Sequence, residues 1–222
     1  MEDSLNETDY RGLKNILISS ASSKTAFLVA YRILLRREAP GSNRKVKLVG
    51  LTSRSNLQFT RRLGLYDQVF AYDQVASISK VAKVDNCLYI DVSGNQSLNE
   101  SIARNIAPKL TIQLGMTSVE GGNVGSVSGA KGNTDKWEFF FMPEWLAVRV
   151  KQVGPKSLKE MQKVAWDQLM EDCPSWVKIE TYSGEREVLE AYLKTLKGGA
   201  PPDEGQMFTL WDKSILNYSA KL

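Results

Sequence analysis

The chain has 222 residues, enough for one sizeable domain with a hydrophobic core, and its apolar and charged fractions are those of an ordinary globular protein. A formal net charge of +4 is slight for this length and gives no reason to expect nucleic acid or a membrane as a partner. Histidine is absent and only two cysteines occur, which excludes a histidine base and argues against a zinc site. No apolar stretch is long enough to span a membrane and the polar start is no signal peptide, so we expect a soluble, cytoplasmic, zinc-independent protein.

Apolar runs of strand length alternate with segments of helical period through the first half of the chain. The runs are continuous rather than alternating, which is typical of a parallel sheet covered on both faces. The sequence therefore predicts a doubly wound, mostly parallel α/β sheet of the Rossmann type. The predicted strands are 15–19, 46–51, 68–72, 87–92 and 110–114, and the predicted helices are 24–37, 56–63, a weak one from 73, and one that begins at an N-cap on Asn95 and ends before Pro108.

The composition changes after the fifth predicted strand. Residues 117–135 are rich in Gly, Ser and Asn and indicate a long mobile loop. Helices are expected from Pro143 to about 152, over 157–171 and over 185–196, with strands over 176–181 and 206–211. The expected organisation is one Rossmann-like domain over 13–212, with a disordered or partly ordered arm over 1–12 and a tail over 213–222.

The turn after the first strand, LISSASSKTAF (17–27), lies where nucleotide phosphates bind in this class of fold, yet it has no glycine. The three glycine positions of a dinucleotide fingerprint fall on Ser20, Ser23 and Ala26. Small side chains permit close approach, their hydroxyls can donate to phosphate oxygens, and Lys24 adds a cation at a helix N-terminus. The alternative is that Ser22 or Ser23 only caps the helix.

The end of the second strand, Gly50 to Ser55, carries no acidic residue. NAD-preferring domains place an acid there to bind the ribose 2′-hydroxyl. Here Arg54 can instead bind a 2′-phosphate in a bidentate manner, and Ser53 can add a hydroxyl donor. The alternative is a solvated arginine at a helix start. Together with the serine-rich turn, this strand end favours NADP(H) as the ligand.

The segments ILISSASSKTAF, VGLTSRSNLQFTRRLGLYDQVFAYD, LYIDVSGN and EFFFMPEWLAVRVKQVGP together resemble a poorly characterised domain-of-unknown-function family related to the medium-chain dehydrogenase/reductases, near the quinone and enoyl reductases. The resemblance runs from about Leu13 to Trp211 and implies NADP(H) as the cofactor. By position the resemblance implies Ser22, Ser23, Lys24 and Thr25 at the pyrophosphate, Ser53 and Arg54 at the 2′-phosphate, Gly94 and Asn95 at a ribose, and Gly115, Met116, Phe140 and Phe141 at the nicotinamide. The alternative for Phe140 and Phe141 is that they belong to an apolar strand in the core.

The chain departs from the medium-chain reductases at its start, because only about a dozen residues precede the first strand where those enzymes carry an N-terminal GroES-like domain. The resemblance implies hydride transfer to or from a carbonyl or activated alkene of a small-molecule substrate, with no catalytic residue assigned. The alternatives are a non-catalytic nucleotide-sensing or interaction protein and a truncated product of a two-domain reductase. A homodimer or a separate GroES-like domain is the expected partner.

The chain ends in Ala220-Lys221-Leu222, which resembles the Ser-Lys-Leu peroxisomal address. Delivery to the peroxisome is therefore the alternative to a cytoplasmic location.

Overall fold

The computed structural model describes residues 1–40, 42, 45–82, 86–114, 136–198 and 200–211. The chain divides into two compact units, Met1–Leu158 and Lys159–Leu222. The sequence predicted a single domain over 13–212, so the structure differs in separating the last third of the chain. The loop over 117–135 and the tail over 213–222 lie outside the described residues.

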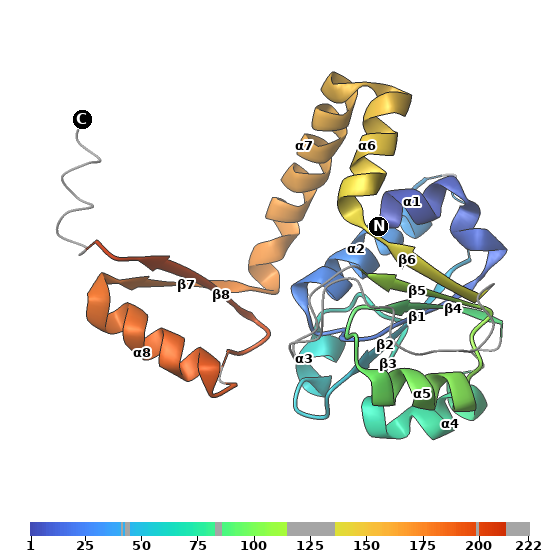
Figure 1. The fold of residues 1–222 in the computed structure, drawn as a ribbon, viewed down its shortest axis with the longest axis horizontal. Coiled ribbons are helices and arrows are strands. Elements are labelled where there is room, and N and C mark those ends of the chain that lie inside the picture. The colour runs from blue at the N-terminus through green and yellow to red at the C-terminus, as the bar shows by residue number, and fades with distance from the viewer. Residues whose placement is uncertain (41, 43–44, 83–85, 115–135, 199, 212–222) are drawn as a thin grey trace. The chain divides into compact units, whose positions relative to one another are not determined.

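The first unit contains a six-stranded sheet of order β3-β2-β1-β4-β5-β6, in which every neighbouring pair is parallel (Figure 1). This is the strand order of the doubly wound Rossmann fold, so the predicted fold class is confirmed. The order reverses between β1 and β4, and the carboxyl ends of these two strands flank the crevice where such folds bind ligands. The strands are β1 Asn15–Ile18, β2 Lys47–Thr52, β3 Gln68–Ala71, β4 Cys87–Asp91, β5 Leu110–Leu114 and β6 Trp137–Phe140.

Helices cover both faces of this sheet (Figure 1). On one face lie α2 (Lys24–Glu38), α3 (Leu57–Arg62) and α6 (Met142–Val153), and on the other lie α4 (Val75–Ala82) and α5 (Gln96–Asn105). The core under α4 and α5 is made of strand and helix side chains buried together, because both strand faces are apolar. Its members are Leu17, Val49, Leu51, Val75, Ile78, Cys87, Tyr89, Leu98, Ile102 and Ile106.

The predicted elements of this sheet agree with the structure to within about two residues at most ends. The weak helix predicted from Asp73 begins as a 3-10 turn, Tyr72–Gln74, that leads into α4. The predicted N-cap of α5 is confirmed, because the Asn95 Oδ1 accepts a hydrogen bond of 2.9 Å from the Leu98 N–H.

The first twelve residues are structured, where the sequence led us to expect a disordered or partly ordered arm. They form helix α1, Glu2–Glu7, and a 3-10 turn, Asp9–Gly12. Leu5 and Tyr10 are almost fully buried, at 2% and 1% exposure. The apolar side chains of this short segment pack into the first unit, which the polar composition of the segment did not indicate.

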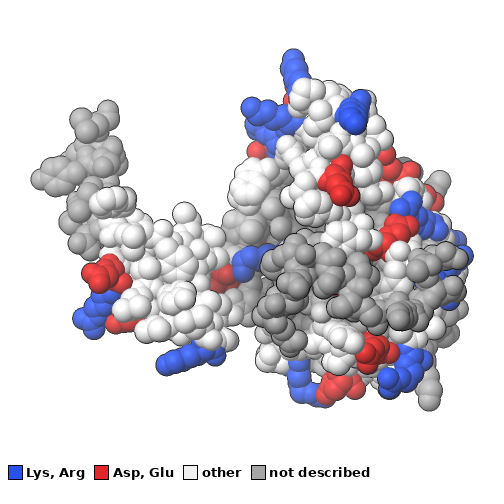
Figure 2. Space-filling view, in the orientation of Figure 1, with Lys and Arg blue, Asp and Glu red and all other residues white. Residues whose placement is uncertain are grey.

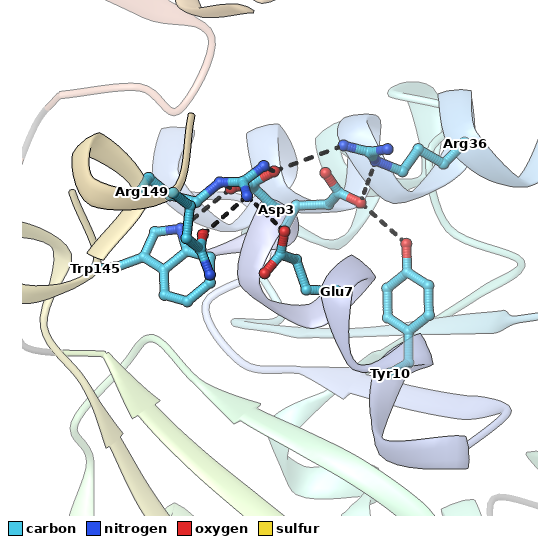
Figure 3. Close-up of polar contacts among 8 residues, drawn as sticks. Asp3, Glu7, Tyr10, Arg36, Trp145 and Arg149 are labelled. Atoms are coloured by element: carbon cyan, nitrogen blue, oxygen red, sulfur yellow. Dashed lines mark hydrogen bonds and ion pairs between the residues drawn. The ribbon is translucent and has the colours of Figure 1, made fainter. Parts of the chain in front are cut away.

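A polar network joins α1 to helix α6 (Figure 3). The guanidinium of Arg149, a side chain only 10% exposed, pairs with the carboxylates of Asp3 and Glu7. The Trp145 indole N–H donates to Asp3 over 3.2 Å. The surrounding carboxylates compensate the cost of removing the arginine charge from water. These partners are more than 140 residues apart in sequence, so local sequence patterns could not reveal the network.

On the α2 side of α1, Glu2 forms a second part of the network with Arg36 and Tyr10, two residues that Figure 3 labels. Its carboxylate is 2.7 Å from the Arg36 Nε and accepts a hydrogen bond of 3.0 Å from the Tyr10 hydroxyl. Glu2 is only 6% exposed, and the cation and the phenol compensate its lost hydration. Helix α1 is therefore attached to both α2 and α6.

The second unit contains one parallel pair of strands joined by a helix. Here β7 (Lys178–Ser183) pairs with β8 (Glu204–Thr209), and α8 (Gly184–Leu196) connects them. The two strands are each displaced by two residues from their predicted positions, toward each other in sequence. Helix α7, Pro155–Asp172, precedes them. Large apolar side chains of this unit are exposed, among them Val164, Trp166, Ile179, Leu189, Leu196 and Met207.

Charged side chains are mixed on the face of the molecule shown in Figure 2, where Lys and Arg lie among Asp and Glu rather than in a patch of one sign. The described Lys and Arg side chains on this face therefore do not gather into a basic surface of the kind that binds a polyanion. Within the described part of the chain, no helix is both long and apolar enough to cross a membrane.

Candidate functional site

The turn between β1 and α2, expected to bind phosphate, contains no glycine. Ser20 adopts a φ of +52°, in the left-handed region that glycine enters without cost and that other residues occupy with strain of about 1–3 kcal/mol. The Ser23 N–H donates to the Ser20 carbonyl over 2.7 Å and closes the turn. Serine thus provides here the backbone conformation for which a dinucleotide fingerprint uses glycine.

The glycine that allows close packing under this loop lies in the neighbouring strand. A Cβ on Gly50 of β2 would lie 2.9 Å from the Ala21 Cβ, closer than real contacts allow, and 3.1 Å from the Tyr66 ring, tighter than most real contacts. The Ala21 N–H donates to the Leu51 carbonyl over 2.8 Å, and the Tyr66 hydroxyl donates to the Ala21 carbonyl over 3.0 Å. Gly50 therefore lets the loop lie directly against β2.

Ser23 is the N-cap of α2, because its Oγ accepts a hydrogen bond of 3.3 Å from the Ala26 N–H. The capping alternative is thus confirmed for Ser23, but not for Ser22. The buried Ser22 Oγ accepts hydrogen bonds of 3.1 Å from Thr52 Oγ1 and from Asn56 Nδ2, and so joins the loop to the end of β2.

Lys24 and Thr25 form the start of α2, a helix of fifteen residues. Backbone N–H groups in the first turn of a helix have no partner within the helix and create a positive potential there. The Lys24 side chain is exposed, so its ammonium group adds to this potential at the mouth of the crevice. A cap at Ser23 and an anion site at the next residues are compatible, because they use different N–H groups.

Arg54 follows β2, as predicted, but it is not alone there. Its guanidinium pairs with the carboxylate of Asp73, which follows β3, and the two side chains are 72% and 55% exposed. Ser53 accepts a hydrogen bond of 3.3 Å from the Asn56 N–H and lies 2.9 Å from the Ser55 Oγ. The residues that follow β2 include no acid, but Asp73, which follows the neighbouring strand β3, lies beside Arg54 in space.

Asp91, at the end of β4, is a central residue of the site that the sequence analysis did not identify. It is 1% exposed, and its Oδ1 accepts hydrogen bonds of 3.0 Å from Ser19 Oγ and from the N–H groups of Ser93 and Gly94. Its Oδ2 accepts one of 2.7 Å from Asn99 Nδ2. A lone carboxylate within the apolar run CLYIDV is the signal that could have revealed it.

Asp91 also affects two tyrosines near the strand ends. Burial raises the pKa of Tyr72, the Asp91 carboxylate raises it further, and hydrogen bonding to Ser20 opposes the rise. Burial, followed by Asp91, raises the pKa of Tyr89 well above its ordinary value. The Tyr89 hydroxyl donates to Asn99 Oδ1 over 2.8 Å. Both phenols therefore remain protonated at neutral pH, and the Tyr89 hydroxyl serves as a hydrogen-bond donor.

The residues expected at the ribose lie beside the Asp91 network. Gly94 has a φ of +63° and donates to Asp91, and Asn95 uses its side chain to cap α5. Their backbone thus follows the carboxyl end of β4, next to the phosphate loop in the sheet order. No contact in the structure tests a ribose role for them.

The two phenylalanines expected at the nicotinamide lie at the end of the edge strand β6. Phe140 is half-buried and Phe141 is 41% exposed and stacks on Phe139, with ring centroids 6.4 Å apart. Neither is a core residue among those described, so the core-strand alternative is wrong. Gly115 and Met116, expected beside them, lie outside the described residues, as does Ala220-Lys221-Leu222. Their roles stay predictions.

Several solved structures are similar to this chain in fold. They include CurA from Vibrio vulnificus in complex with NADPH (TM-score 0.54, 10% identity, 94% of this chain and 62% of that one). YhdH from E. coli K-12 with bound NADPH has a TM-score of 0.53, 12% identity and coverage of 94% and 59%. The YhdH oxidoreductase from Salmonella enterica in complex with NADP has a TM-score of 0.52, 11% identity and the same coverage. At these identities the likeness shows a shared fold.

Residues 1–201 match DUF2855, a family of proteins of unknown function, and the chain belongs to that family. No curated protein matches the sequence. The chain spans about three fifths of the length of the NADPH-bound structures it resembles.

Proposed function

We propose that the protein binds NADP(H) at the carboxyl ends of β1 and β2 and is a reductase-like oxidoreductase. The observation that carries this proposal is the left-handed turn at Ser20, which leads directly into a long helix with Lys24 in its first turn. The residues present fit a dinucleotide, because Gly50 leaves room for the loop and two cations, Lys24 and Arg54, follow β1 and β2. The fold shared with structures solved in complex with NADPH or NADP supports the proposal.

In this proposal the residues after each strand bind a different part of the nucleotide. Ser22–Thr25, around the start of α2, hold the pyrophosphate, and Ser53 and Arg54 hold the 2′-phosphate. Gly94 and Asn95 approach a ribose. The nicotinamide side lies toward β5 and β6, with Gly115, Met116, Phe140 and Phe141. When bound, the cofactor supplies hydride transfer to or from a carbonyl or an activated alkene, and this chain supplies position and electrostatics without zinc.

The second candidate function is a non-catalytic nucleotide-sensing or interaction protein. It is favoured by the engagement of the Tyr89 hydroxyl, near the end of β4, in hydrogen bonds to Asn99 and Asp91. Turnover of NADPH with a panel of enones, quinones and aldehydes separates the two functions. Oxidation of NADPH with any of these substrates supports the reductase, and binding without turnover supports the sensor.

The experiment for the pyrophosphate site is Lys24→Ala. Because both nucleotides carry the same pyrophosphate, we expect their affinities to fall alike, by about 1–2 kcal/mol for a charge-assisted contact on an exposed side chain. Titration followed by nucleotide fluorescence measures this, with Lys14→Ala, an exposed lysine before the amino end of β1, as the matched control. Unchanged affinity in Lys24→Ala would leave SSASSKT as a capped helix start and nothing more.

We further propose that the second unit binds a partner, either a second copy of the chain or a separate GroES-like domain. A two-stranded sheet needs further packing for stability, and here large apolar side chains on α8 and both strands are exposed. We expect the chain alone to self-associate through these surfaces in sedimentation experiments at micromolar concentration. Replacing Ile179 and Leu196, 62% and 65% exposed, by lysine should then restore the 24.8 kDa monomer. A monomer at every concentration before substitution would contradict a second copy of the chain as the partner.

A further inference from the structure

The ion pair between Arg54 and Asp73 lies where the proposed 2′-phosphate must bind. Strands β2 and β3 are parallel neighbours in which Thr52 pairs with Ala71. Arg54 and Asp73 each follow these paired positions by two residues. The register of the two strands therefore brings the cation and the acid next to each other beyond the strand ends. Their pairing is a consequence of strand register rather than of chance contact on the surface.

The geometry of the pair shows what it does to the guanidinium. The Arg54 Nε and Nη2 groups both donate to the same oxygen, Oδ2 of Asp73. The edge of the guanidinium formed by these two nitrogens is one that a phosphate could bind in a bidentate manner. A phosphate therefore either replaces Asp73 on this edge or binds another edge of the same guanidinium, close to the carboxylate.

We propose that Asp73 sets the cofactor selectivity of the site, because its carboxylate competes with the 2′-phosphate of NADP(H) for the guanidinium of Arg54. This inference rests on the proposed NADP(H) site. Asp73 lowers the affinity for NADPH in two ways: the pair must open or be shared, and the two anions repel each other. NADH has no 2′-phosphate and experiences neither effect. Asp73 thus reduces the preference for NADPH over NADH that Arg54 creates.

The opposing effect is that Asp73 holds Arg54 in a defined orientation before the nucleotide binds. Exposed ion pairs contribute little to such ordering, and this pair is 72% and 55% exposed. A phosphate with nearly two negative charges experiences a repulsion that acts over several ångströms, although solvent and salt weaken it. Asp73 therefore lowers the affinity for NADPH through repulsion and competition by more than it raises that affinity through the orientation of Arg54.

The test is Asp73→Asn, which keeps the shape of the side chain and removes its charge. We expect NADPH to bind about 3- to 10-fold more tightly, with NADH affected less than about 2-fold. Glu38→Gln is the matched control, because it removes an exposed carboxylate beside Arg37 at the far end of α2, away from the carboxyl ends of the strands. Both affinities should be unchanged in that variant.

Two further variants separate this inference from the proposed function. In Arg54→Ala the NADPH affinity falls selectively if the site is correct, and adding Asp73→Asn to it should give a smaller gain than in the presence of Arg54. If Arg54→Ala is selective but Asp73→Asn leaves the ratio of NADH to NADPH dissociation constants unchanged or lowers it, the competition is wrong and the site stands. If Arg54→Ala weakens neither nucleotide selectively, the 2′-phosphate site itself is wrong. Thermal unfolding within a few degrees of the unmodified protein verifies that each variant is folded.

Discussion

Asp91→Ala is expected to lower the free energy of unfolding by about 3–5 kcal/mol, because it removes the common acceptor of a buried network. Ser19, Asn99 and the backbone after β4 all donate to this carboxylate. Each buried donor left without an acceptor costs about 1–3 kcal/mol, although water entering the gap recovers part of that cost. The loss should be the largest of any single polar substitution proposed here.

Urea unfolding followed by far-UV circular dichroism measures this effect. Asp91→Asn retains one carbonyl oxygen but directs an amide toward the Asn99 amide, so we expect an intermediate loss. Asp73→Asn serves as the control, because an exposed carboxylate contributes at most about 1 kcal/mol. If Asp91→Ala unfolds at the same urea concentration as Asp73→Asn, the network does not support the strand ends.

Arg54→Ala is expected to weaken NADPH binding by about 1.5–3 kcal/mol, the magnitude of a charge-assisted hydrogen bond, and to leave NADH nearly unchanged. Opening the pair with Asp73 reduces the net contribution of the arginine, whereas the carboxylate left unpaired in the variant repels the phosphate. These two effects have opposite signs, so the expected magnitude stays within this range.

Isothermal titration of both nucleotides measures the selectivity of the Arg54 variant. Arg54→Lys keeps the charge but loses the planar fork, so it should lie between the unmodified protein and Arg54→Ala. An equal loss for NADPH and NADH in Arg54→Ala would show that the arginine does not bind the 2′-phosphate.

The sequence predicted the first five strands of the central sheet well because each of them is a short apolar run between turn residues. β1 to β5 and α5, with its cap at Asn95, follow from such local patterns. The predicted bounds of β7 and β8 differ from the observed ones because the apolar residues Trp176 and Trp211 lie just outside the paired residues Lys178–Ser183 and Glu204–Thr209. Local patterns indicate a strand but not its pairing limits.

The features missed from the sequence depend on contacts between distant residues. The left-handed Ser20 goes against the preference of serine, and only the surrounding packing imposes it. Asp73 lies nineteen residues from Arg54, and Asp3 lies 146 from Arg149. Lys24 and Arg54 follow β1 and β2, as the sequence predicted, but the sequence could not show that Asp73 pairs with Arg54.

The central claim is that this serine-rich turn and Arg54 form an NADP(H) site. The most direct measurement is a titration of the unmodified chain with NADPH and with NADH under the same conditions. The account predicts saturable binding of both through the shared pyrophosphate, with NADPH bound at least about 10-fold more tightly, as one charge-assisted contact to the 2′-phosphate requires. Equal affinities, or no binding of either nucleotide, would contradict it.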